Sequence, residues 1–475
     1  MEIKCLGGVN EIGGNKILLE HKNTRIFLDF GMSFKQISKY FSEYLNPRKS
    51  RSLIDFLEMD LLPDLKGIYR EDYLYHMGRK DENKEIDAVF LTHAHADHAQ
   101  YIHFLREDIP IYCTKTTYQM LKVIEDTGIG SFQDLVTISP TFDFYKNKNG
   151  GLSKINRSKK GYIKNRKFNI MKDEEIIKIK DLKIEMINVD HSLPGSCGFI
   201  VYSDVGNLVY TGDIRFHGYH EEDSKKFIEK SKKANPRWLI SEGTRIDSDD
   251  KDSEKKVNSV ISNYISKSSG LVFVEHPIKD LDRVTTIYNA SNENKRNFVV
   301  TPKQAYLINE LQDICSFKPK DVKILIPPKE WGLLFSKRDD IETIFKEFHP
   351  KREYKKWEQD LIWGKNNSMK NNCITFRELV KKPEKYVVSM NLWEINQLID
   401  IKPKNAIWIK SSCEPFSDDM FLDEERKNNW LEKYNIEEFS AHASGNACGT
   451  EIKSMINRID PDEIVPVHTE HPEMF

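Results

Sequence analysis

The sequence predicts an α/β protein made of two α/β parts. Two observations support this fold class. Several apolar, strand-like runs end directly before histidine or aspartate residues, as at Thr92-His93, Asp190-His191 and Gly212-Asp213. Strand-like and helix-like segments then alternate again between residues 241 and 425. Because α/β folds gather functional side chains beyond the carboxyl ends of their strands, the first observation also predicts a site there.

The composition is that of a globular protein with more than one structural unit. Its 475 residues exceed what a single hydrophobic core usually supports, and 39% of them are hydrophobic and 31% charged. The formal net charge of −2 excludes an overall basic, histone-like protein. It does not exclude a local basic channel, since the distribution of charge steers a polyanion more than the sum does.

Neither membrane attachment nor a disulfide framework is expected. The sequence has no apolar stretch of the ~18 residues that span a bilayer, and it starts without the basic and apolar regions of a signal peptide. The seven cysteines are scattered and form no CxxC pair, which argues against disulfides and against a thiolate zinc site. We therefore predict a cytoplasmic protein.

The first half of the chain is expected to form strands joined by short turns. Residues 17–19 and 25–28 are apolar runs bracketed by glycine and polar residues. Residues 86–91, 183–189 and 208–210 are further apolar runs, and each leads into a histidine or aspartate. These runs predict the strands that carry the site.

The second half repeats a βα pattern. Its apolar runs alternate with segments of helical character, and this alternation predicts a second α/β layer. The strand-like runs are residues 270–274, 297–300 and 322–326, and the helix-like segments are residues 279–293 and 303–315.

Residues 146–167 form a strongly basic segment between the strand-like runs. The segment contains nine Lys or Arg residues and no acidic residue, which is typical of an exposed loop. A solvated insertion and a loop that contacts a nucleic-acid backbone both agree with this composition. The sequence does not decide between them.

The strongest motif is the hexapeptide from His93 to His98. It places His93, His95, Asp97 and His98 directly after a strand-like run. Neutral imidazole and carboxylate groups together suit Zn²⁺ or Mn²⁺. The motif therefore predicts a metal site, although a histidine-rich surface turn is the plain alternative.

Three further positions make the motif resemble the metallo-β-lactamase fold. Downstream of His93–His98, His191 and Asp213 stand at strand ends in the order of that fold's later ligand motifs, and Asp29 in Leu28-Asp29-Phe30-Gly31 is similar to its first motif. A lone histidine or a lone Thr-Gly-Asp would be weak evidence. The resemblance implies that Asp29 holds the geometry of the cluster without binding metal.

Later motifs resemble the β-CASP branch of that fold and, within it, ribonuclease J and its archaeal-type relatives. The motifs are spread over nearly the whole chain. The segments Leu239–Arg245, Phe439–Gly445 and Val465–Glu470 are similar to the β-CASP motifs A, B and C, in that order. Three further segments are similar to stretches shared by ribonuclease J proteins: Gly7–Gly13, Cys413-Glu414-Pro415-Phe416 and His468–Glu473. One departure is Ala441, where the family usually has glycine, which adds a methyl group beside the expected phosphate pocket.

This resemblance implies an αββα metallo-β-lactamase sandwich with an inserted α/β β-CASP domain. The expected boundaries are 1–240 for the first part of the sandwich, 241–424 for the β-CASP domain and 425–475 for the last part of the sandwich.

The resemblance also implies a two-metal phosphodiesterase. It assigns two Zn²⁺ per chain, with Mn²⁺ and Mg²⁺ left open, and it makes Asp97 and His442 catalytic, with Glu242 orienting His442. The implied metal ligands are His93, His95, Asp97, His98, His191, Asp213 and His468, with Asp213 bridging, and the implied phosphate or RNA contacts are Ser440, His442 and Ser444.

The expected activity is hydrolysis of single-stranded RNA by a 5′→3′ exonuclease, with endonuclease activity left open. In the family, histidine at motif C, here His468, goes with RNA substrates, and valine goes with DNA. A β-CASP DNA nuclease and a catalytically inactive RNA-binding paralogue remain as alternatives. A small-molecule hydrolase of the same fold is disfavoured by the long 241–424 insertion. Nothing in the sequence supports a homodimer.

Overall fold

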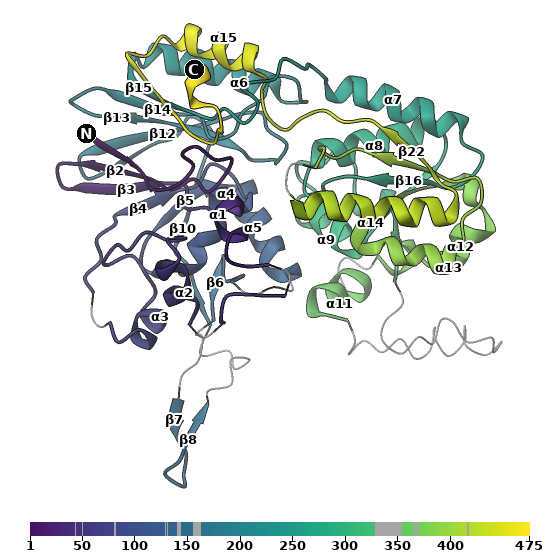
Figure 1. Cartoon of the computed structure of the whole chain (residues 1–475), viewed down its shortest axis with the longest axis horizontal. Helices are drawn as coiled ribbons and strands as arrows, with labels where there is room; N and C mark the ends of the chain where they lie inside the picture. The colour runs from purple at the N-terminus through teal and green to yellow at the C-terminus, as the bar shows by residue number, and fades with distance from the viewer. Residues whose placement is uncertain are drawn as a thin grey trace. The chain divides into compact units, whose positions relative to one another are not determined.

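The computed structural model of the protein divides into two compact units. Unit 1 comprises Met1–Lys251 and Gly445–Phe475, and unit 2 comprises Asp252–Ser444 (Figure 1). Residues 155–162 of the basic segment and Phe416 lie outside the described residues. The structure describes residues 1–42, 44–49, 51–79, 82–128, 130, 132–139, 144–154, 163–327, 354–364, 369–415 and 418–475.

Unit 1 is built on two six-stranded sheets. The order of the first is β1 (Glu2–Cys5), β2 (Ile17–His21), β3 (Thr24–Leu28), β4 (Ala88–Phe90), β5 (Ile111–Thr114) and β10 (Phe168–Met171). The order of the second is β11 (Ile176–Ile179), β12 (Leu182–Asn188), β13 (Cys197–Tyr202), β14 (Asn207–Tyr210), β15 (Pro236–Ser241) and β23 (Glu463–Pro466).

A hydrophobic core joins the two sheets face to face. Alternate residues of one strand point to the same face, so Ile17 and Leu19 of β2 reach the same core as Phe199 and Val201 of β13. On the other side of the second sheet, α6 (Glu221–Lys233) and α15 (Gly449–Ile459) bury their apolar faces. Because α5 (Lys115–Thr127) packs on β5 and β10, the predicted αββα sandwich is confirmed.

Shorter elements complete unit 1. They are α1 (Phe34–Ser38), α2 (Ser52–Glu58), α3 (Glu71–His76), α4 (Ala96–Ala99), the 3₁₀ turns Gln100–Phe104 and Pro472–Met474, and the strand pairs β6 (Thr137–Ile138) with β9 (Lys164–Asn165) and β7 (Phe144–Lys146) with β8 (Leu152–Lys154). Among the described residues, no helix has both the length and the apolar composition needed to cross a bilayer.

The basic segment is only partly an exposed loop. Its described residues form the β7–β8 hairpin and β9. Arg166 is buried, and its guanidinium donates hydrogen bonds to the backbone carbonyls of His103, Leu105 and Asp134. The prediction of an exposed basic loop was therefore wrong for Arg166, because five N–H donors on one side chain can satisfy several buried carbonyls at once.

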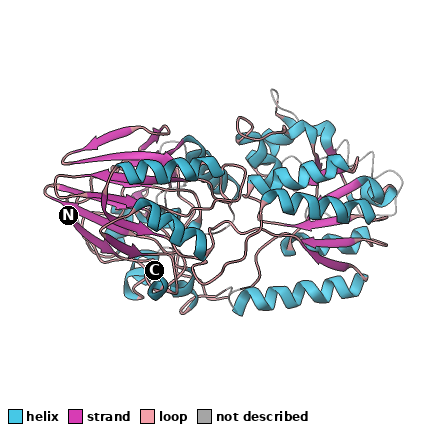
Figure 2. Cartoon of the chain, turned by 90° about the horizontal axis from the view of Figure 1, so that it is seen from above, coloured by secondary structure: helices cyan, strands magenta, loops and turns pink. Residues whose placement is uncertain are grey.

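Unit 2 is a seven-stranded, all-parallel sheet with helices against it (Figure 2). The order of its strands is β19 (Cys373–Ile374), β18 (Lys323–Leu325), β17 (Asn297–Val300), β20 (Tyr386–Ser389), β16 (Val272–Glu275), β21 (Ile407–Lys410) and β22 (Glu437–Ser440). Its helices are α7 (Glu254–Lys267), α8 (Leu281–Glu293), α9 (Pro302–Glu310), α11 (Lys356–Trp363), α12 (Phe376–Lys381), α13 (Leu398–Ile401) and α14 (Asp418–Tyr434), and its 3₁₀ turns are Pro319–Asp321, Lys370–Asn372, Pro383–Lys385 and Leu392–Gln397. The second α/β layer expected from the sequence is confirmed.

The boundaries between the units lie later than the sequence analysis placed them. The chain leaves the sandwich after β15 and returns to it from Gly445 onward, with α15 and then β23, which pairs in parallel with β15. The sequence predicts that residues 425–444 belong to the sandwich. In the structure they belong to unit 2, where β22 pairs in parallel with β21. Strand pairing, which joins residues distant in sequence, therefore moves the second boundary from 424 to 444.

Candidate metal centre

The predicted ligands gather at one edge of the sandwich. Parallel strands end at the same edge, and the loops that follow them carry the functional side chains. Asp29 follows β3, His93 follows β4, His191 follows β12, Asp213 follows β14, Glu242 follows β15 and His468 follows β23. All of these side chains are buried.

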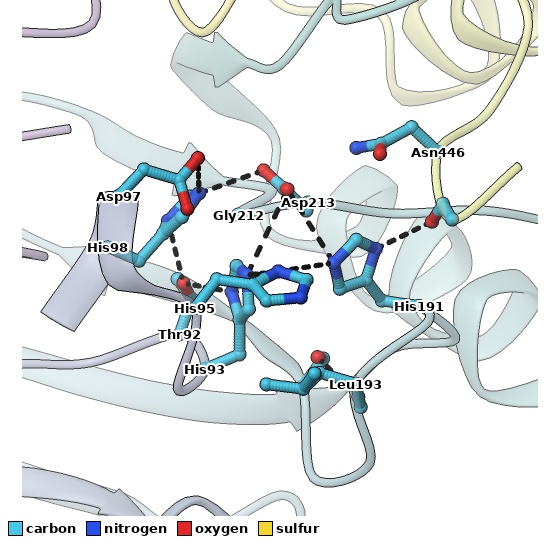
Figure 3. A network of polar contacts seen from close by, with 12 residues as sticks. Thr92, His93, His95, Asp97, His98, His191, Leu193, Gly212, Asp213 and Asn446 are labelled. Atoms are coloured by element: carbon cyan, nitrogen blue, oxygen red, sulfur yellow. Dashed lines mark hydrogen bonds and ion pairs between the residues drawn. The ribbon is translucent and has the colours of Figure 1, made fainter. Parts of the chain in front are cut away.

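One group of ligand atoms lies around His95. The Nδ1 atom of His95 is 2.9 Å from Nε2 of His93 and 3.2 Å from Nε2 of His191. The Oδ2 atom of Asp213 is 3.6 Å from Nε2 of His191 and 3.9 Å from Nε2 of His93. These four side chains point toward one another (Figure 3) and could hold a metal ion between them.

A second group shares Asp213 with the first. The Nε2 atom of His468 is 3.0 Å from Oδ2 of Asp97. The Oδ1 atom of Asp213 is 3.2 Å from Nε2 of His98 and 3.7 Å from Nε2 of His468. Asp213 therefore directs one carboxylate oxygen toward each group, as a bridging ligand would.

The outer ring nitrogens of the histidines are held by hydrogen bonds. Nδ1 of His98 lies 2.7 Å from Oδ2 of Asp29, and Nδ1 of His191 lies 2.6 Å from the carbonyl of Gly445. Both partners accept, so each Nδ1 carries the proton and donates it. In the neutral form of each ring, Nε2 is then the unprotonated nitrogen and points into the cluster, which is the tautomer that binds a metal.

The donor set fits divalent cations. Nδ1 of His95 lies 2.9 to 3.2 Å from Nε2 of His93 and Nε2 of His191, so three ring nitrogens converge on a point where one cation could bind them all. The buried Oδ1 atom of Asp213 makes no hydrogen bond, and a buried carboxylate oxygen is costly in that state. A cation in each group would satisfy these atoms, and the mixture of nitrogen and carboxylate ligands is compatible with zinc or manganese.

The histidines of the cluster differ in whether their pKa is lowered or raised. Burial lowers the pKa of His191 to about 3, and burial with the neighbouring imidazoles lowers the pKa of His93 well below its usual range. Burial would also lower the pKa of His468, but the carboxylates of Asp213 and Asp97 outweigh it and raise this pKa to about 9. Without metal at pH 7, His191 is thus neutral and His468 is protonated.

Metal affinity is therefore expected to rise with pH. A cation that binds beside His468 must displace its proton, so each pH unit below about 9 should weaken binding at this group by about tenfold. Titration of the metal-free protein with Zn²⁺ at pH 6.5 and pH 8.5, in two buffers of different ionisation enthalpy, measures the affinity and the proton release. An affinity independent of pH, with no proton released, would contradict the assignment of His468 as a ligand.

Two threonines belong to the site and were not singled out in the sequence. Thr92 donates its backbone N–H and its hydroxyl to Asp29, and its hydroxyl lies 3.0 Å from Nδ1 of His93. Thr244 donates its hydroxyl to Glu242 and lies 2.8 Å from Nδ1 of His468. Thr92 directly precedes His93, and Thr244 lies in motif A two residues after Glu242. The sequence does not predict that either hydroxyl connects a carboxylate to a histidine, because threonine occurs in many other environments.

The motif A and motif B residues belong to different units. Glu242 lies in unit 1, where Ile214, Thr244 and Asn446 donate hydrogen bonds to its carboxylate. Burial and the neighbouring Asp213 carboxylate nevertheless raise the pKa of Glu242. Ser440 is the last residue of β22 in unit 2, and His442 and Ser444 follow it. The pairing of Glu242 with His442 stays a prediction.

Two family models match the chain. A beta-lactamase superfamily domain matches residues 60–234, and a Zn-dependent metallo-hydrolase RNA specificity domain matches residues 431–474. The second match contains His442 and His468. A crystal structure of a protein of unknown function from Enterococcus faecalis V583 matches with a TM-score of 0.71 at 21% identity, covering 100% of this chain and 95% of that one.

Curated relatives carry the name ribonuclease J. Ribonuclease J 2 of Streptococcus pyogenes serotype M3 is 24% identical over 72% of this chain and 52% of its own length. Ribonuclease J of Mycoplasma pneumoniae is 22% identical over 100% of this chain and 68% of its own length. Ribonuclease J of Pyrococcus abyssi is 24% identical over 52% of this chain and 46% of its own length. The chain thus spans between about half and two thirds of their lengths. The chain therefore carries a beta-lactamase superfamily domain and an RNA specificity domain of Zn-dependent metallo-hydrolases, and over its αββα sandwich and inserted parallel sheet it is similar to proteins named ribonuclease J.

Proposed function

We propose that this protein is a metal-dependent ribonuclease that hydrolyses phosphodiester bonds of single-stranded RNA. The observation that carries the proposal is the cluster around Asp213, in which four histidines place their Nε2 atoms within 3.9 Å of its carboxylate oxygens. The relatives named ribonuclease J and the RNA specificity model support RNA as the substrate. Action from the 5′ end is part of the proposal.

Two zinc ions are the proposed cofactors, one in each group of ligand atoms. His93, His95, His191 and Asp213 would hold the first, and Asp97, His98, His468 and Asp213 the second. When bound, such a pair supplies a hydroxide nucleophile at neutral pH and positive charge for the scissile phosphate.

The side chains around the cluster hold these ligands for the reaction. Asp29 orients His98, and Thr244 connects Glu242 to Nδ1 of His468. Glu242 thus supports the motif C histidine through Thr244 in addition to its expected role beside His442. His442 is proposed to donate a hydrogen bond to the leaving 3′-oxygen. Ser440 and Ser444 are proposed to contact phosphate, as the family resemblance implies.

A time course on end-labelled substrates tests the proposal. The full chain, loaded with Zn²⁺ or Mn²⁺, is incubated with single-stranded RNA and DNA of one sequence, each labelled at the 5′ or the 3′ end. Early release of mononucleotides from the 5′ end of RNA is expected, with 5′-monophosphorylated RNA degraded faster than 5′-triphosphorylated RNA. Faster cleavage of DNA would favour a DNA nuclease, and RNA binding without cleavage would favour an inactive paralogue.

A further inference from the structure

Arg283 is a fully buried cation whose guanidinium spans several elements of unit 2. It lies in the first turn of α8, and its Nε and Nη2 donate to the two carboxylate oxygens of Glu254, in the first turn of α7, at 3.1 and 2.8 Å. Both side chains are essentially inaccessible to solvent. A buried ion pair with two parallel hydrogen bonds has a rigid geometry, so the remaining donors of Arg283 have fixed directions.

Those remaining donors hold the loop that carries His442. Nη1 of Arg283 donates to the carbonyl and the hydroxyl oxygen of Ser411 at 2.7 and 2.9 Å and lies 3.1 Å from Nδ1 of His442. Nη2 donates to the carbonyl of Ala443 at 2.9 Å. On the other side of the histidine, Ala441 donates its N–H to the carbonyl of Lys410, at 2.9 Å. The backbone is therefore held on both sides of His442.

The contact with Arg283 determines which ring nitrogen of His442 carries the proton. A guanidinium has only N–H donors and cannot accept a hydrogen bond. A proton on Nδ1 would face Nη1 at 3.1 Å, placing two donors, and in the imidazolium form two cations, against each other. Nδ1 is therefore the acceptor, and the proton of the neutral ring lies on Nε2, across the ring from Arg283.

We propose that Arg283, held by Glu254, is a positioning residue that keeps His442 in the neutral Nε2–H tautomer. This N–H then stabilises the leaving 3′-oxygen of the phosphodiester by a hydrogen bond, in place of a proton transfer that would need the imidazolium form. The inference rests on the proposed ribonuclease function for its consequence in catalysis. The tautomer itself is a property of unit 2 and exists without substrate.

Lysine at position 283 should not replace this function. An ammonium is a point charge on a flexible chain, whereas the planar guanidinium pairs with Glu254 through two atoms and still directs donors to His442 and Ala443. Arg283→Lys keeps the positive charge beside Glu254 but should let the imidazole of His442 rotate or change its tautomer.

Arg296 offers a matched control in the same unit. It is also a buried arginine, and it donates to the backbone carbonyls of Gly270 and Ile265 and contacts that of Ser268, with no hydrogen bond to a histidine. Arg296→Lys therefore removes a comparable set of structural hydrogen bonds. A purely structural role of Arg283 predicts that the two lysine variants behave alike.

Long-range ¹H–¹⁵N spectra of the histidine-labelled full chain provide the direct test. The His442 resonances are assigned from their absence in His442→Gln. At pH 7.5 the wild type and Arg296→Lys are expected to show His442 protonated on Nε2 alone, and Arg283→Lys to show a mixture of states. A His442 ring that carries its proton on Nδ1, or on both nitrogens, in the wild type would overturn the proposal.

Kinetics with single-stranded RNA extend the test. Misplacement of a reacting group by ~1 Å costs about 10²-fold, so Arg283→Lys should lower kcat by between about 10- and 100-fold at unchanged KM and unchanged metal content. Equal kcat values for Arg283→Lys and Arg296→Lys would overturn the catalytic part. Because the spectra need no substrate, a wild type with the Nε2–H tautomer but no RNA cleavage would refute only the ribonuclease function and support the tautomer assignment.

Discussion

Replacement of Asp213 by asparagine is expected to abolish RNA cleavage while the protein stays folded. Asp213 directs Oδ2 toward His93 and His191 and Oδ1 toward His98 and His468. Asparagine has the same shape, but it lacks the negative charge and turns one oxygen into an NH₂ donor. Stabilisation by paired cations is worth several kcal/mol, so kcat should fall by at least about 10³-fold.

The same variant should lose bound metal and keep its affinity for RNA. Cleavage of labelled single-stranded RNA, metal ions per chain and RNA binding by fluorescence anisotropy are measured on one preparation. Asp55→Asn is the control, because Asp55 is also a buried carboxylate of unit 1 but accepts hydrogen bonds from Arg48. An Asp213→Asn protein with more than a tenth of the wild-type activity would falsify the bridging role.

Replacement of Asp29 by asparagine is expected to weaken metal binding although Asp29 lies outside both ligand groups. Oδ2 of Asp29 accepts hydrogen bonds from the hydroxyls of Thr92 and Tyr210 and from Nδ1 of His98. The asparagine oxygen would still accept the backbone N–H of Thr92, which donates to Oδ1 at 2.7 Å. Its NH₂ group would then face three donors, and His98 would relieve the conflict by moving its proton to Nε2.

A proton on Nε2 of His98 blocks the nitrogen that faces Asp213, so the affinity for metal should fall by about 10- to 100-fold. Asparagine tolerates the positive φ of 58° at position 29, so the backbone should not be the cause of the loss. Metal titration monitored by restored RNA cleavage measures the effect, which high metal concentrations should partly reverse.

Tyr210→Phe is the matched control for Asp29→Asn. It removes one hydrogen bond to Asp29 but leaves the acceptor for the His98 proton in place. Its metal affinity should stay within about threefold of wild type, because a single hydrogen bond contributes about 1 kcal/mol and this one does not set the tautomer. Equal losses in both variants would show that packing around Asp29, and not its charge, supports the site.

The sequence by itself determined the candidate ligands and the strands that carry them. The His93–His98 motif is local, because its four candidate ligands lie within six residues after one strand. The order of His191, Asp213 and His468 along the chain then made the fold family recognisable. Apolar runs also placed the strands of both units, since buried parallel strands are continuous hydrophobic segments.

Tertiary structure alone decided how these groups act on one another. Three features depend on contacts between segments that are distant in the sequence. Asp213 directs one oxygen to each ligand group, acceptors hold the outer ring nitrogens of His98 and His191, and Arg283 contacts His442, 159 residues away. The same reason explains the later domain boundary after β22 and the burial of Arg166. A residue's type records which hydrogen bonds it can make, but only packing of distant segments decides which of them it makes.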